Sequence, residues 1–232
     1  MTQELYEITR GELKPLVNKV VKFFNNWDQN LTNLSKKLMK VFQVENDYNV
    51  ITKIGNLGLL EQEYYKKYVD TIVRKYLENF IRLLEELHPE INQFLMFTRK
   101  EVNLLNIMLK NLLKLVEKGK NVISLEYEDY FNVLHEYLLL VNNLLDSIIY
   151  DVVTKQSILD ELTGKFLLRE AKNIELLRVY MICLQNHSLG ADINTLIETL
   201  EFGHQIVNFQ PDLKVDGEYH NRFLQLTAKI DF

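Results

Sequence analysis

Residues that interrupt helices are scarce in this chain, which has 8 Gly and 3 Pro among 232 residues. The blocks between them repeat apolar side chains every three or four positions, the spacing of one face of an α-helix. Barrels and β-sandwiches need turn residues at short intervals, so they are excluded, and a single cysteine excludes a disulfide scaffold. The sequence therefore predicts an all-α protein, an elongated antiparallel bundle of long helices with a smaller C-terminal helical appendage.

We expect the helices to begin and end at the few breakers. Gly11 and Pro15 predict a short first helix and a second helix that begins near residue 15. Pro89 predicts a helix end at His88, because proline disfavours helical geometry in the residue before it. Loops are expected within 46–58 and over 211–217. The expected helices cover residues 2–10, 15–42, 59–87, 89–118, 124–162, 165–186, 192–208 and 218–230.

The domain organisation is expected to be simple. We find no linker rich in Pro, Gly or Ser and no repeat at a fixed period. One domain over residues 1–232 is therefore expected, with an alternative subdivision into a bundle over 1–187 and a C-terminal appendage over 188–232.

Two neighbouring helices, 89–118 and 124–162, are joined by only a few residues and are expected to pack together. Leu104 and Ile107 give the first of them apolar side chains outside its main stripe, a pattern typical of a central helix. The residues expected to share one core are Leu105, Leu109, Leu112, Leu134, Leu138, Val141 and Leu145.

Compartment is predicted from three features. The first residues lack a basic segment followed by an apolar one, so no signal peptide is expected. The most apolar stretch, 137–153, is broken by Asn and Asp residues, so we expect a buried helix there and no membrane span. With the lone Cys183, these features predict a cytoplasmic protein.

Charge is unevenly distributed along the chain. Residues 121–163 contain one basic residue, Lys155, against eight acidic ones, whereas residues 89–120 contain six basic and three acidic residues. Two interpretations stay open: solvated faces of neighbouring helices, or an acidic surface that binds a protein with a basic surface. The carboxylates of the expected partner surface are Glu136, Asp146, Asp151, Asp160 and Glu161.

Two Glu-x-x-His pairs are candidate metal ligands, because residues three apart project from the same side of a helix. The pairs are Glu85 with His88 and Glu201 with His204, and Glu170 is a candidate for a further carboxylate. His88 stands at an expected helix end, whereas ligands of this kind lie within a helix. We therefore expect no metal or other cofactor, with a ligand- or metal-sensing bundle as the alternative.

The segment Asp160-Glu-Leu-Thr-Gly164 resembles the opening of bacterial diguanylate cyclase domains, but the downstream signature of that family is absent from the sequence. We interpret the segment as a turn that ends the preceding helix. The same turn permits a helix-turn-helix with Lys165, Arg169 and Lys172 on its second helix, and hence a nucleic-acid-associated factor. The net charge of −5 argues against this further alternative.

Catalytic motifs are absent from the sequence: it contains no Gly-rich phosphate loop, no nucleophile elbow and no Cys-His dyad. Long helices with wide apolar faces are typical of proteins that act by binding other proteins. The sequence therefore favours a non-catalytic adaptor, scaffold or regulatory protein. Its oligomeric state is left open.

Overall fold

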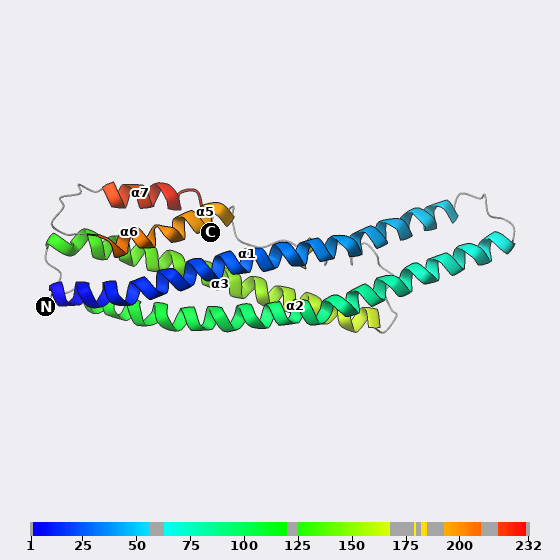
Figure 1. The fold of residues 1–232 in the computed structure, drawn as a ribbon, viewed down its shortest axis with the longest axis horizontal. Coiled ribbons are helices and arrows are strands. Elements are labelled where there is room, and N and C mark those ends of the chain that lie inside the picture. Colours follow the sequence, from blue (N-terminus) through cyan, green and yellow to red (C-terminus); the bar gives the residue numbers. More distant parts are fainter. Residues whose placement is uncertain are drawn as a thin grey trace. The chain divides into compact units, whose positions relative to one another are not determined.

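The computed structural model describes residues 2–55, 63–119, 125–167, 179, 182–184, 193–209 and 218–230 (Figure 1). All regular secondary structure in these residues is α-helical, so the prediction of an all-α protein is confirmed. The helices are α1 (Thr2–Gly55), α2 (Glu63–Gly119), α3 (Leu125–Leu167), α5 (Ile193–Glu201), α6 (Gly203–Val207) and α7 (Glu218–Thr227).

The predicted break at Gly11 and Pro15 is wrong, because α1 continues through both residues. A proline inside a helix removes one backbone hydrogen bond and costs about 3 kcal/mol. Leu13, Leu16 and Val17, which flank Pro15, are completely buried. Burying each of these side chains contributes about 1.5–3 kcal/mol, so packing outweighs the local cost.

The predicted helix end at His88 is also wrong, since α2 runs through Pro89. Buried Leu87 and Ile91 stand on either side of the proline and hold this part of the helix against the core. The loop expected within 46–58 is wrong up to Gly55, where α1 ends, and its remaining residues lie outside the described part.

The turn expected at Thr163-Gly164 is wrong as well, because α3 is continuous to Leu167. A glycine within a helix costs only about 1 kcal/mol, which the rest of a long helix can absorb. Most of the helix expected over 165–186 lies outside the described residues, although 179 and 182–184 are helical. The helix expected over 192–208 is present as α5 and α6, separated at Phe202, and α7 matches the last expected helix.

The chain divides into two compact units. Unit 1 consists of Met1–Gln29, Thr98–Asp151 and Ser188–Phe232, and unit 2 of Asn30–Phe97 and Val152–His187. The C-terminal residues considered above as an appendage therefore group with unit 1.

The core of unit 1 contains the residues predicted from helical spacing. Every residue of the predicted set is at most 2 % exposed, so its burial is confirmed. Leu104 and Ile107 are 49 % and 59 % exposed, so the expectation of a central helix is wrong at these two positions. The buried set is Leu105, Leu109, Leu112, Leu134, Leu138, Val141 and Leu145.

One described segment, Tyr127–Glu161 within α3, is long and apolar enough to cross a membrane by length and composition alone. Its most apolar window has a mean hydropathy of 1.2, and half of that window is buried inside the protein. The core helix of a soluble protein meets the same criterion.

Candidate interaction surface

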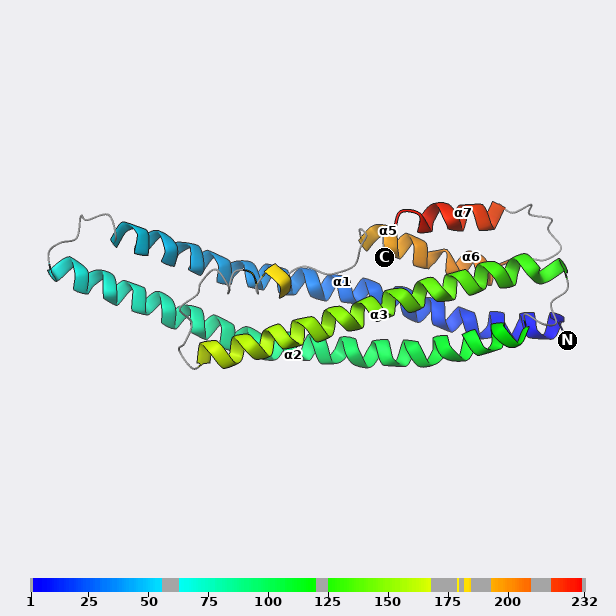
Figure 2. The ribbon, with the colours of Figure 1, turned by 180° about the vertical axis from the view of Figure 1, so that it is seen from behind.

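The outward side of α3 within unit 1 carries a stripe of acidic, amide and apolar side chains at alternating spacings of three and four residues. All members are exposed except Glu136, which is half-buried. Leu139 is 44 % and Tyr150 70 % exposed. Figure 2 shows α3 in the foreground. We call this stripe the α3 face; it consists of Asp129, Asn132, Glu136, Leu139, Asn143, Asp146 and Tyr150.

The charge of the α3 face is negative, because α3 contains no lysine or arginine between Leu125 and Asp151. Asp146 accepts a hydrogen bond of 2.9 Å from Nδ2 of Asn142, one turn earlier. An amide donor orients the carboxylate but leaves its charge in place. The face therefore offers fixed negative charge next to exposed apolar surface.

The other carboxylates predicted for the partner surface lie in different settings. Asp151 is only 6 % exposed, so its carboxylate is not available to a partner in the folded chain. Asp160 and Glu161 belong to unit 2, where Asp160 is exposed and Glu161 half-buried. Asp160 accepts a hydrogen bond of 3.0 Å from Nε2 of Gln156.

The buried side of α3 contacts the C-terminal helices through a hydrogen bond and an aromatic pair. The hydroxyl of Tyr137 donates a hydrogen bond of 2.9 Å to the carbonyl of Leu200, near the end of α5. This satisfies one of the carbonyls that a helix end leaves without a partner inside the helix. The ring of Tyr137 lies 6.3 Å from that of Phe223 in α7. These contacts fix the orientation of α3, and with it the direction of the α3 face.

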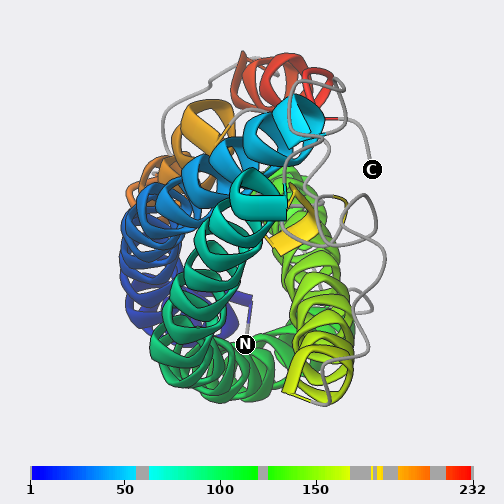
Figure 3. The same cartoon turned by 90° about the vertical axis from the view of Figure 1, so that its right-hand side faces the viewer.

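Side chains in the first turns of α1 also form hydrogen bonds with this C-terminal region (Figure 3, α1 in blue and α6 in orange). The Tyr6 hydroxyl donates to the carbonyl of Phe209 at 2.5 Å, and Nε of Arg10 donates to the carbonyl of Val207 at 2.7 Å. The ring of Tyr6 packs edge-on against Tyr130 of α3 at 4.8 Å. The N-terminal, central and C-terminal parts of unit 1 are thus tied together by side chains that donate to backbone carbonyls.

Alkaline pH is expected to destabilise unit 1. Burial raises the pKa of Tyr130 and of Tyr137 above the ordinary value of a phenol, since the ionised form loses solvation. Below about pH 10 both phenols are neutral in the folded and the unfolded chain. Above it the unfolded chain loses these protons first, so stability should fall by up to about 1.4 kcal/mol per pH unit for each tyrosine.

Urea denaturation between about pH 9 and pH 11 measures this effect, with Tyr137→Phe as the comparison. The variant should start from a lower stability, because the Leu200 carbonyl loses its donor. Its stability should then fall less steeply with pH. Equal slopes for the two proteins would contradict the assignment of the alkaline effect to Tyr137.

The candidate metal ligands lie apart from the α3 face. Glu85 and His88 are on α2 in unit 2, with Glu85 exposed and His88 half-buried. Glu201 ends α5 and His204 is in α6, both in unit 1, and Glu170 lies outside the described residues. Within the described part of the chain, no three His, Cys, Asp or Glu side chains are grouped closely enough to hold a metal ion.

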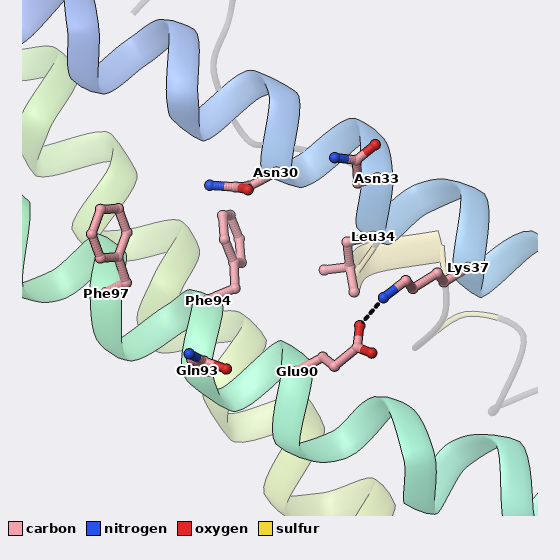
Figure 4. Close-up of a pocket in the computed structure, with 8 residues that line it drawn as sticks. All are labelled: Asn30, Asn33, Leu34, Lys37, Glu90, Gln93, Phe94 and Phe97. Atoms are coloured by element: carbon pink, nitrogen blue, oxygen red, sulfur yellow. Dashed lines mark hydrogen bonds and ion pairs between the residues drawn. The ribbon is translucent and has the colours of Figure 1, made fainter.

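A pocket of about 580 Å³ lies between α1 and α2 in unit 2 (Figure 4). The ring of Phe94 points from α2 toward α1, and Lys37 forms an ion pair with Glu90 at the rim. Amide side chains, aromatic rings and one ion pair line this pocket, and the alternative of a ligand-sensing bundle stays a prediction. The lining residues are Asn30, Asn33, Leu34, Lys37, Glu90, Gln93, Phe94 and Phe97.

Comparison with protein-family models, with curated proteins and with solved structures finds no match. The segment 160–164, which resembles the opening of diguanylate cyclase domains, lies within the continuous helix α3. The helix-turn-helix alternative required a turn at the same place, so its geometric basis is lost. Lys165 is part of α3, and Arg169 and Lys172 lie outside the described residues.

Proposed function

We propose that this chain is a non-catalytic interaction module, an adaptor, scaffold or regulator, whose α3 face binds a protein with a basic surface. One observation carries the proposal: Leu139 is exposed between the carboxylates of Asp129 and Asp146, and Tyr150 is exposed one turn beyond Asp146 on the same helix face. We further propose that the long helices run as an elongated antiparallel bundle and that the protein acts in the cytoplasm.

The two kinds of side chain on the α3 face have separate roles in binding. Burial of Leu139 and Tyr150 against a partner removes apolar surface from water and supplies affinity. The carboxylates around them attract a basic surface and reject an acidic one, so they supply association rate and specificity. Binding of this type weakens as salt screens the charges.

Co-purification from the native host tests the proposal by comparing two charge-reversed forms of the tagged chain. One carries Asp129→Lys with Asp146→Lys on the α3 face. The matched control carries Glu4→Lys with Glu12→Lys, two exposed carboxylates of α1 in the same unit, and has the same net charge. We expect partner recovery to fall at least about tenfold, equivalent to about 1.4 kcal/mol, for the α3 form alone.

Circular dichroism and thermal unfolding establish that both forms fold. The proposal is contradicted if every recovered protein binds the α3 form and the control form equally well at the same salt concentration.

A further inference from the structure

The outward side of α2 within unit 1 carries a second stripe with the opposite charge. Its residues are all exposed and alternate at spacings of four and three. Leu104 and Ile107, 49 % and 59 % exposed, occupy its middle, and lysines occupy its ends. We call this stripe the α2 face; it consists of Lys100, Leu104, Ile107, Asn111, Lys114 and Lys118.

The two faces are similar in length and opposite in charge. At 1.5 Å per residue the α2 face is about 27 Å long and the α3 face about 32 Å long. Each contains two apolar side chains and at least one asparagine among charged residues, which are positive on α2 and negative on α3. Opposite charges beside exposed apolar side chains specify which helix faces pair, as the charged positions beside the apolar seam of a coiled coil do.

A simple register shows how the charges meet. With Ile107 placed opposite Leu139, the residues seven positions further along each helix are Lys114 and Asp146. They are opposite one another if the helices run in the same direction. If the helices run in opposite directions, Lys100 is opposite Asp146. Both orientations therefore bring an ammonium group to the same carboxylate while the apolar pair is buried.

We propose that the α3 face of one copy of this chain binds the α2 face of a second copy. The inference rests on the proposed function and names its basic partner. Both faces belong to unit 1, where the helices are already packed and yet leave Ile107 and Leu139 exposed, so the pairing is between copies. The partner chemistry that the α3 face requires, lysines around exposed aliphatic side chains, is present on the chain itself.

A charge-swap experiment tests this pairing directly. The basic form carries Asp129→Lys and Asp146→Lys, and the acidic form carries Lys100→Glu and Lys114→Glu. Like charges then oppose one another when either form meets itself, and opposite charges meet in both possible contacts when the two forms are mixed. Sedimentation velocity of each form and of an equimolar mixture measures the association.

We expect each form alone to self-associate at least about tenfold more weakly than the unaltered chain. The mixture should associate with an affinity within about threefold of that of the unaltered chain. The Glu4→Lys, Glu12→Lys control should associate like the unaltered chain. If a reversed form does not fold, the neutral pairs Asp129→Asn with Asp146→Asn and Lys100→Gln with Lys114→Gln replace it, and each should weaken association several-fold.

Two results would overturn the inference: a monomeric unaltered chain at every concentration tested, or a mixture that associates no better than its components. The proposed function would survive either result if reversal of the α3 face still removed a different protein in the co-purification. It would fail together with the inference only if that reversal changed no binding at all.

Discussion

Replacing Leu109 or Leu138 with alanine is expected to lower the free energy of unfolding by about 2–5 kcal/mol, the range for truncating a buried leucine. Both side chains are completely buried in unit 1, one from α2 and one from α3. The loss combines the transfer free energy of the deleted methyl and methylene groups with the cavity that the neighbours do not fully close. Urea denaturation followed by circular dichroism measures it.

Leu104→Ala and Leu139→Ala are the matched controls, since they make the same chemical change on the same two helices. These side chains are 49 % and 44 % exposed, so we expect changes within about 0.5 kcal/mol. The contrast separates burial from helix propensity, which is altered equally in all four variants. Losses below about 0.5 kcal/mol for both buried leucines would show that they are not core residues.

Gly203→Ala is expected to destabilise the chain by about 1–3 kcal/mol, the usual cost of overfilling a packed core. A Cβ atom at this position of α6 would lie 2.5 Å from the Tyr137 hydroxyl oxygen and 2.6 Å from Cγ2 of Val17. Neither neighbour can move aside cheaply. Tyr137 is completely buried and its hydroxyl is held by the Leu200 carbonyl, and Val17 is completely buried too.

Gly11→Ala is the matched comparison and is expected to stabilise the chain, whereas Gly203→Ala is expected to destabilise it. Gly11 is exposed within α1, and a Cβ atom there meets no atom within 4 Å. Alanine is favoured over glycine inside a helix by about 0.5–1 kcal/mol, so this variant should gain stability. Thermal unfolding of the two variants gives the signs. A gain in stability for Gly203→Ala would mean that α6 does not lie against Tyr137 as described.

Helical spacing was enough to predict the fold class and the core of unit 1. Leu134, Leu138, Val141 and Leu145 recur every three or four residues, and such a stripe is buried whenever a long helix packs on its neighbours. The predictions that depend on local breakers failed at Gly11, Pro15 and Pro89, because a breaker costs less than the burial of the apolar residues around it. The turn predicted at Gly164 failed too, because a single glycine within a long helix costs only about 1 kcal/mol.

The candidate surface was only partly predictable. The acidic character of α3 is visible in the sequence, but the sequence wrongly predicts Asp151 as a surface carboxylate, because charged residues are usually exposed. Asp151 lies three residues after buried Ile148 and four before buried Lys155, so it belongs to the buried side of α3. That spacing is the sequence signal that could have predicted its burial. The exposure of Leu139 and Tyr150 was not predicted, because helical spacing identifies the buried apolar side of a helix and gives no signal for apolar residues outside it.

The exposure of the α2 face was not predicted, for a related reason. Apolar residues on several sides of a helix can mean that the helix is central or that one side binds another molecule. Sequence alone does not decide between these, because it does not give the number of neighbours around the helix. The exposure of Leu104 and Ile107 in the folded chain favours the second meaning.

Sedimentation equilibrium of the unaltered chain at low and moderate salt tests the central claim, that the charged faces of unit 1 bind a second copy. We expect the average mass to exceed 27.5 kDa increasingly as concentration rises at low salt. It should return toward that value in about 0.5 M salt, where charges separated by more than a few ångströms are screened. A mass of 27.5 kDa at every concentration and at both salt levels would contradict the claim.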